Sequence, residues 1–180
     1  VGITCVAGNV ALRMTVRNAL RVRELAGRHD VPIFAGCPRP MMRKLETAEE
    51  VHGKTGLDGV DLPEPSLGVD PRHAVGFIIE ACRSAPEGGL TLCPLGPLTN
   101  IALALIMAPD IRAHIREIVL MGGAALGPGN ITPSAEFNIY VDPHAAQVVF
   151  DSGIRLTMLG LDVTHKAIAT PARRAAIEAV

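Results

Sequence analysis

Short apolar runs rich in β-branched residues recur along the chain, and longer helical patterns separate them. The runs are Val1–Val6, Val31–Ala35, Leu90–Leu95, Glu117–Met121 and Ile154–Leu159. None of them alternates regularly between apolar and polar residues, which is typical of parallel strands that are buried on both faces. The runs therefore predict the strands of a mostly parallel sheet.

Helical patterns and capping signals lie between these runs. Helices are expected over Met14–Ala26, His73–Ala85 and Asn100–Ala108. Thr99 is expected to cap the last of these, and Asp142, followed by Pro143 at the first helical position, is expected to cap another helix. Strands that alternate with helices at this spacing predict an α/β fold with a mostly parallel sheet flanked by helices, in a single domain over residues 1–180.

Composition narrows the possible partners. Apolar residues make up 48% of the 180 residues, charged residues 19% and aromatic residues 3%, and the formal net charge is −1. Such a chain lacks the basic surface and the stacking side chains of nucleic-acid-binding proteins, and no apolar run is long enough to span a bilayer. The sequence therefore predicts a small-molecule ligand, with no nucleic-acid and no membrane partner.

Cysteine usage points to a reducing compartment. Cys5, Cys37, Cys82 and Cys93 show no C-x-x-C spacing. We expect buried free thiols instead of disulfides or a zinc site. Together with the absence of a recognisable signal peptide, this predicts a cytoplasmic protein. The chain also opens inside a strand-like run and stops inside a helical pattern, so we expect it to be a section of a longer protein.

Polar side chains follow several of the expected strands. Asn9 follows the first strand, Thr99 the third, and the group Asn130–Asn138 the fourth. Because ligands of parallel α/β sheets bind outside the carboxyl ends of the strands, these residues are expected to converge on one crevice. Turn formation alone would also explain Asn9.

Glu136 and Asn138 are the strongest candidates in this group. They alternate with the apolar residues Phe137 and Ile139. A carboxylate in apolar surroundings needs hydrogen-bond partners, and a polyhydroxylated ligand would supply them.

The irregular segment Gly36–Pro71 contains a further candidate, His52. Long irregular segments in compact domains are often functional, and the glycines around His52 suggest a mobile loop. His52 either acts on a ligand near neutral pH or is simply an exposed loop residue. After the last strand, His165 serves either a site or packing, and Asp162 either caps the turn or orders the site.

Six motifs resemble the inosine–uridine preferring nucleoside hydrolase family, in the family's order and over nearly the whole chain. They are VAGNV (residues 6–10), HGKTGLDG (52–59), PLGPLTNIALAL (94–105), VLMGGA (119–124), GNITPSAEFNIYVDPHAA (129–146) and LDVTH (161–165). The pattern T-P-x-A-E-F-N-I-x-x-D-P is the most specific of them. The resemblance implies a Rossmann-like hydrolase core, here incomplete.

The resemblance also implies an activity and roles for particular residues. Family members are calcium-dependent N-ribohydrolases, in which Ca²⁺ holds the ribose diol and the attacking water, and the N-glycosidic bond breaks through an oxocarbenium-like state. They act in nucleoside catabolism and purine salvage and are usually homodimers or homotetramers. Carried over motif by motif, the resemblance implies that Met121 contacts the underside of the sugar and that Thr99 offers its backbone carbonyl to calcium. It also implies that His52 is a loop residue near the substrate and a candidate catalytic group. The implied ribose-binding residues are Asn9, Asn130, Glu136 and Asn138.

The sequence also departs from the family pattern at positions that bear on catalysis. The family's D-x-D-x-x-x-D-D motif and its downstream His-Asp pair are absent from these 180 residues, and His144 stands where the family usually has Glu. Without those carboxylates the chain is expected neither to bind Ca²⁺ firmly nor to hydrolyse nucleosides by itself. Two alternatives to a truncated hydrolase remain open: a non-catalytic ribose- or nucleoside-binding module, and a fragment with exposed sheet edges that tends to associate.

Overall fold

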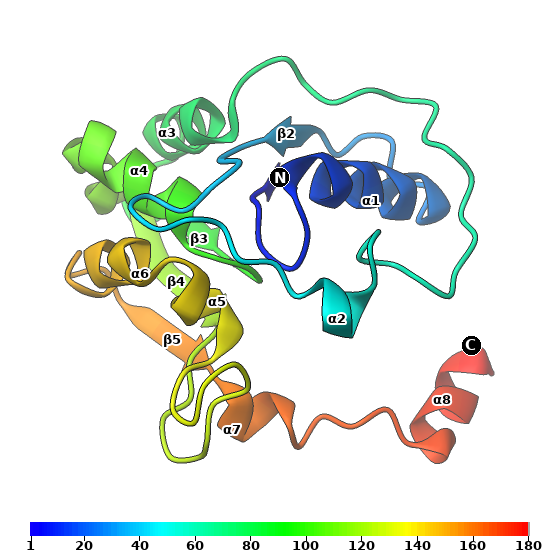
Figure 1. The fold of residues 1–180 in the computed structure, drawn as a ribbon. Helices are drawn as coiled ribbons and strands as arrows, with labels where there is room; N and C mark the ends of the chain where they lie inside the picture. The colour runs from blue at the N-terminus through cyan, green and yellow to red at the C-terminus, as the bar shows by residue number, and fades with distance from the viewer. Residues whose placement is uncertain (180) are drawn as a thin grey trace.

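The strands are divided between two parallel sheets (Figure 1). In this computed structural model, which describes residues 1–179, β1 (Ile3–Cys5) pairs with β2 (Ile33–Ala35). The second sheet has the order β3-β4-β5, and its strands span Leu90–Leu92, Ile115–Met121 and Leu156–Leu159. The predicted α/β class with parallel strands is confirmed, whereas the prediction of one sheet is wrong for this chain.

Helices connect consecutive strands and cover the sheets. The longer ones are α1 (Leu12–Leu25), α3 (Ala74–Ser84), α4 (Thr99–Met107), α6 (Pro143–Phe150) and α8 (Pro171–Glu178). Shorter ones are α2 (Glu49–His52), α5 (Phe137–Val141), α7 (Leu161–Thr164) and the 3-10 helix η1 (Pro109–His114). In Figure 1, α8 lies at the end of an extended connection, away from both sheets.

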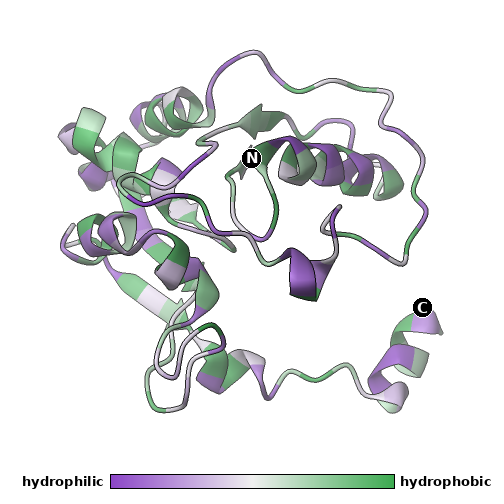
Figure 2. Ribbon diagram, viewed as in Figure 1, coloured by the Kyte–Doolittle hydropathy of each residue, from purple (hydrophilic) through white to green (hydrophobic). Residues whose placement is uncertain are grey.

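The two faces of β2 pack against different helices because successive side chains of a strand point to opposite sides. Ile33 is buried in a cluster with Leu20 of α1, whereas Phe34 stacks on Phe77 of α3 with 3.8 Å between ring centroids. The main core lies where α3, α4 and α6 meet β4. Figure 2 shows α4 as mostly apolar and α1 with separate apolar and hydrophilic stripes, as expected for an interior and a surface helix.

A groove of about 630 Å³ separates the two sheets. Both β1 and β3 contribute to its walls, through residues such as Ile3, Thr4 and Leu92, and Leu95 lies at its rim. β3 and β5 are only partly buried, contrary to the expectation of strands buried on both faces. The reason is that each of them forms an edge of its three-stranded sheet.

Asn100 links the two halves of the fold. Its amide nitrogen donates to the carbonyl oxygen of Cys5 and its amide oxygen accepts from the N–H of Cys37, both at 2.9 Å. The side chain is buried, and a Cβ at Gly36 would collide with it. Glycine at position 36 therefore allows the backbone beside β2 to approach α4 closely.

Thr99 does not cap α4, contrary to the prediction from sequence. The helix begins at Thr99 itself, and the Thr99 hydroxyl donates to the Asp142 carboxylate at 2.7 Å. Asp142 is fully buried and caps α6 as predicted, by accepting from the N–H of Ala145 at 3.1 Å; it also accepts from the N–H of Met41 at 2.9 Å. A hydrogen bond to a buried carboxylate is stronger than one to a helix N–H, so Thr99 faces Asp142.

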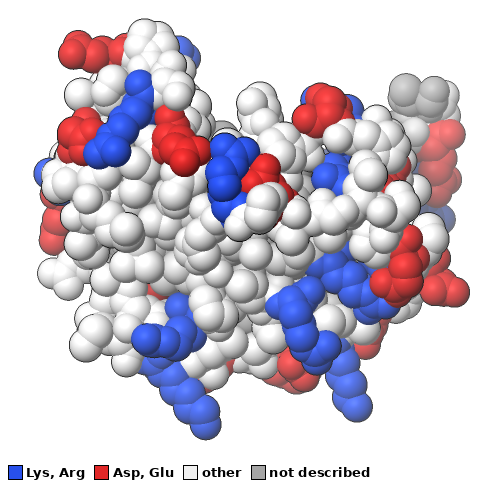
Figure 3. Space-filling model, turned by 90° about the horizontal axis from the view of Figure 1, so that it is seen from above, with Lys and Arg blue, Asp and Glu red and all other residues white. Residues whose placement is uncertain are grey.

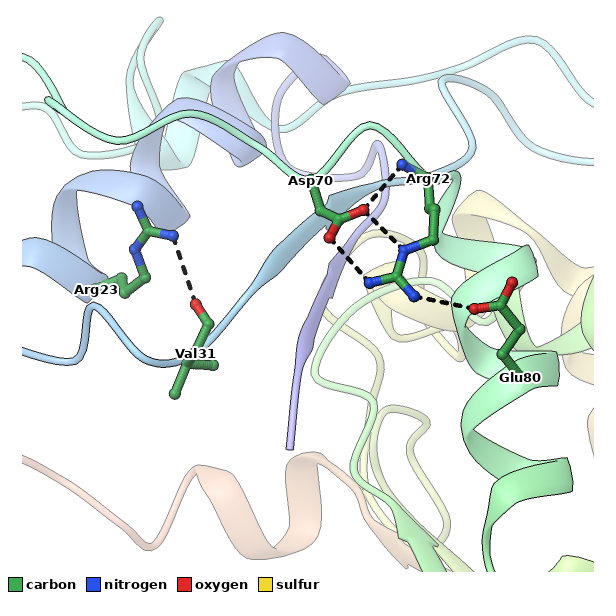
Figure 4. Close-up of polar contacts among 5 residues, drawn as sticks. All are labelled: Arg23, Val31, Asp70, Arg72 and Glu80. Carbon is green, nitrogen blue, oxygen red and sulfur yellow. Dashed lines mark hydrogen bonds and ion pairs between the residues drawn. The ribbon is translucent and has the colours of Figure 1, made fainter.

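The irregular segment that follows β2 returns to pair with β2 at its far end. Asp70 forms an isolated bridge with Phe34, and its carboxylate accepts two hydrogen bonds of 2.9 Å from the Arg72 guanidinium, which also reaches Glu80 at 3.0 Å (Figure 4). These Arg72 contacts lower the pKa of Asp70 to about 2. Just before β2, Figure 4 also shows Arg23 directed at the Val31 carbonyl. The bridge from Asp70 fixes the far end of the long segment to the sheet of β1 and β2.

The four cysteines do not share one environment. Cys5, Cys37 and Cys82 are buried, and burial is the main cause that raises the pKa of each thiol to about 11. Cys93 is exposed, so the expectation of buried thiols is wrong for it. β3 ends at Leu92, which leaves Cys93 at the wall of the groove.

Alkylation should distinguish these thiols. In the native chain at pH 8, iodoacetamide is expected to modify Cys93 first, because the thiolate is the reactive form and the other thiols are buried and protonated. Peptide mass spectrometry after timed quenching measures the order of labelling. Unfolding in urea should make all four cysteines react at similar rates; equal rates in the native chain would contradict the expected order.

Acidic and basic side chains are interspersed on the face displayed in Figure 3, without a large area of one sign. Within the part of the chain that the structure describes, none of the helices has the length and apolar character needed to cross a membrane.

Candidate functional site

A pocket of about 340 Å³ lies at the carboxyl ends of the strands. Asn9 follows β1, Leu95 follows β3, Met121 ends β4 and Leu161 follows β5, and all of them line it. Residues of the short helices α2, α5 and α7 complete the wall. This is the position at which parallel α/β folds bind ligands.

The pocket brings together all but one of the residues to which the family resemblance assigned a role. Those that line it are Asn9, His52, Met121, Asn130, Glu136 and Asn138. Thr99 is not among the lining residues, because its side chain is buried against Asp142. His165 and His144 are exposed and lie outside the pocket wall.

The Glu136 carboxylate has one oxygen fixed by the protein and one directed elsewhere. Oε2 accepts from the N–H of Gly123 at 3.0 Å and from the N–H of Ile139 at 3.3 Å, so Glu136 also caps α5. Oε1 has no hydrogen bond to any residue within 1–179, although the side chain is almost fully buried. A carboxylate oxygen that lies in a pocket wall without a protein partner is well placed to accept from a ligand.

The side-chain amide of Asn138 likewise has one polar atom bound by the protein and one that is free within residues 1–179. Its amide nitrogen donates to the carbonyl oxygen of Met121 at 3.1 Å and contacts Met121 Sδ at 3.3 Å, with a longer bond of 3.4 Å to the Leu95 carbonyl. These contacts orient the side chain between the ends of β3 and β4. Its amide oxygen has no partner in the part of the chain that the structure describes, and therefore remains available as an acceptor.

Asn130 and Asn9 supply amide groups from two further segments. Asn130 Oδ1 accepts from the N–H of Phe137 at 2.9 Å, which leaves its amide nitrogen available as a donor. Asn9 uses its backbone carbonyl to accept from the N–H of Ala48 at 2.9 Å, which joins the end of β1 to the start of α2. Hydrogen bonds among the described residues do not involve the Asn9 side chain.

His52 ends α2, and hydrogen bonds hold the loop that follows it. Asp58 accepts from the N–H groups of Lys54 and Thr55, each at 3.1 Å, and from the Thr55 hydroxyl, the contact that most lowers the pKa of Asp58. Asn18 donates to the Thr55 carbonyl at 2.7 Å. The loop is thus more firmly bonded than its glycines suggested.

Sequence reasoning missed most of the apolar wall. It consists of Ala48, Val51, Leu95, Ile131, Phe137 and Leu161. Thr164, also missed, adds a hydroxyl from α7. The position of α7 directly after the last strand is the sequence signal that could have indicated Leu161 and Thr164. The pocket therefore combines amide and carboxylate groups with an apolar surface, which suits a ligand with both hydrogen-bonding groups and an apolar part.

The residues present do not fit a calcium site. Among residues 1–179 there is no group of three or more His, Cys, Asp or Glu side chains that could hold a metal ion. Ca²⁺ takes six to eight oxygen ligands, commonly with several carboxylates. Glu136 and Glu50 are the carboxylates in the pocket wall, and Thr99 lies outside it.

Fold and pocket define the class: a parallel α/β protein with a polar, partly apolar pocket at the carboxyl ends of its strands. The sequence profile of the inosine–uridine preferring nucleoside hydrolases matches residues 1–180. The chain belongs to this family.

Relatives and solved structures agree with this assignment. The chain is 51% identical to the pyrimidine-specific ribonucleoside hydrolase RihB of Escherichia coli O9:H4 over 170 residues, which are 94% of the chain and 53% of RihB. It is 52% identical to RihA of Photobacterium profundum over 165 residues, covering 92% of the chain and 53% of RihA. The purine-preferring ribonucleoside hydrolase of Gardnerella vaginalis superposes with a TM-score of 0.85 at 39% identity, covering 89% of the chain and 52% of that structure. The chain thus spans about half the length of these relatives.

Proposed function

We propose that the whole protein hydrolyses the N-glycosidic bond of ribonucleosides to ribose and free base, and that this chain supplies its ribose-binding wall. The observation that carries the proposal is the set of uncommitted polar atoms in one pocket: Oε1 of Glu136, Oδ1 of Asn138 and the side chain of Asn9. Family membership and the names of the relatives support the same reading.

In this proposal each lining residue has a role. Glu136 and Asn138 accept hydrogen bonds from ribose hydroxyls, Asn9 and Asn130 contribute amide groups, and Met121 lies under the sugar. Cleavage develops positive charge on the ribose ring, and a fixed carboxylate nearby stabilises it electrostatically. His52 lies at the pocket wall and is the candidate group near the departing base.

Calcium enters the proposal for the whole protein only. By resemblance, Ca²⁺ would supply an activated water and hold the ribose diol. The carboxylates present here do not make such a site, so we propose that the chain alone neither binds Ca²⁺ firmly nor hydrolyses inosine or uridine. We also propose, for the whole protein, a homo-oligomer in the cytoplasm.

Titration of the isotope-labelled chain tests ribose binding. We expect ribose and uridine to shift the NMR signals of Asn9, Glu136 and Asn138, and we expect 2-deoxyribose to bind more weakly, since it leaves a buried acceptor without a partner. Calorimetry with CaCl₂ should show no micromolar binding. Equal binding of ribose and deoxyribose, or shifts confined to other residues, would refute the site assignment.

A non-catalytic nucleoside-binding module remains the second candidate, favoured by the missing metal carboxylates among the described residues. Turnover of inosine or uridine by the full-length protein would decide between the two.

A further inference from the structure

The carboxylate of Glu136, the N-cap residue of α5, is held partly by a residue outside that helix. One of the two hydrogen bonds on its carboxylate comes from the N–H of Gly123, which immediately follows the end of β4. The position of Gly123, together with the N–H of Ile139, therefore determines where the free oxygen Oε1 points.

Gly123 is held between the pocket and α7. Its φ of +79° favours glycine, and its carbonyl accepts from the N–H of Leu161 at 2.9 Å. A Cβ at Gly160 would come within 2.6 Å of that carbonyl oxygen, so the two backbones are in close contact. Gly123 thus joins α7 to the Glu136 carboxylate through its two backbone groups.

Most of the residues that follow Gly123 are exposed, so polar contacts instead of apolar packing must hold them in place. Ala125, Leu126 and Gly127 are all exposed, and Leu126 is 96% accessible, so apolar packing does not hold them. Asp162, in the first turn of α7, does so instead. Its carboxylate accepts from the N–H of Ala125 at 2.8 Å and from the N–H of Leu126 at 3.3 Å, and the first of these contacts is the main reason that its pKa is lowered.

We propose that Asp162 is a positioning residue for the pocket. By binding the loop after Gly123, it keeps the Gly123 N–H on the Glu136 carboxylate and fixes the loop that carries Asn130. The same four-residue helix presents Leu161 and Thr164 to the pocket. Asp162 does not cap α7, which begins after Gly160 without a side-chain cap, so its carboxylate serves the neighbouring loop.

The test compares Asp162→Ala and Asp162→Asn with Asp151→Ala, an exposed aspartate at the end of α6, in the isotope-labelled chain. We expect Asp162→Ala to move the backbone amide signal of Gly123, whose proton reports its bond to Glu136. We also expect it to weaken ribose binding about tenfold, the size of one lost hydrogen bond. Asp162→Asn keeps one acceptor and should have a smaller effect of the same kind. Asp151→Ala should change neither signal nor affinity.

The signal of Gly123 tests the inference without any ligand, whereas the affinity arm rests on the proposed function. If the wild-type chain bound no ribose, the proposed function would fail while the Gly123 signal still decided the role of Asp162. If Asp162 were only a local anchor, its substitution would shift the amide signals of Ala125 and Leu126 alone. The proposal would be overturned if the Gly123 signal stayed unchanged in both Asp162 variants while they unfolded in urea like the wild-type chain.

Discussion

Replacing Asp142 with alanine should lower the free energy of unfolding by about 3 to 5 kcal/mol, as expected when a helix cap is lost and buried donors are left without partners. The carboxylate accepts from the N–H of Met41, the hydroxyl of Thr99 and the N–H of Ala145. These groups belong to three distant segments, which the substitution would separate from one another. Urea unfolding followed by circular dichroism measures the loss.

Two variants sharpen this measurement. His144→Ala changes an exposed residue in the first turn of the same helix and should cost little. Asp142→Asn keeps the shape, but its amide nitrogen must face one of the donors, so it should still destabilise the fold. A loss below about 1 kcal/mol for Asp142→Ala, the size of an ordinary cap alone, would mean that the contacts to Met41 and Thr99 contribute nothing.

Replacing Glu136 with glutamine should weaken ribose binding about 100-fold, because hydrogen bonds to a charged group contribute about 1.5 to 3 kcal/mol each. Glutamine can still accept from the N–H of Gly123 with its oxygen, which preserves the cap of α5. Its amide nitrogen then replaces the acceptor Oε1 that faces the pocket. Calorimetric titration of the chain with ribose measures the change.

The control for this variant is Glu46→Gln. Glu46 bonds to Arg43 and Tyr140 on the surface and does not line the pocket. It should leave ribose affinity unchanged. In the full-length protein, Glu136→Ala and Asn138→Ala should mainly reduce turnover of nucleosides, and wild-type kcat/KM in either variant would contradict the assignment of the site.

The strands and the pocket were predictable from local patterns. Apolar runs located every strand, because burial requires apolar side chains. The rule that ligands bind at the carboxyl ends of parallel strands predicted from the sequence alone that Asn9 and Glu136 lie together. The roles of these residues came from the resemblance of their motifs to a family, since hydrogen-bonding side chains alone do not specify a ribose ligand.

Long-range contacts were not predictable in the same way. Thr99 carries the local signature of a helix cap, but the buried Asp142, distant in sequence, attracts its hydroxyl. Cys93 continues an apolar run, yet it is exposed because the neighbouring sheet does not pair with β3. The apolar side of the pocket, including Leu161, was missed because apolar residues occur throughout the chain and carry no distinguishing mark.

Leu95 connects the two hollows of this molecule. Leu95 lines both the pocket that contains Asn138 and the groove between the sheets, and its carbonyl accepts from the Asn138 amide. A polypeptide or ligand that fills the groove will therefore contact a residue that is hydrogen-bonded to the pocket wall.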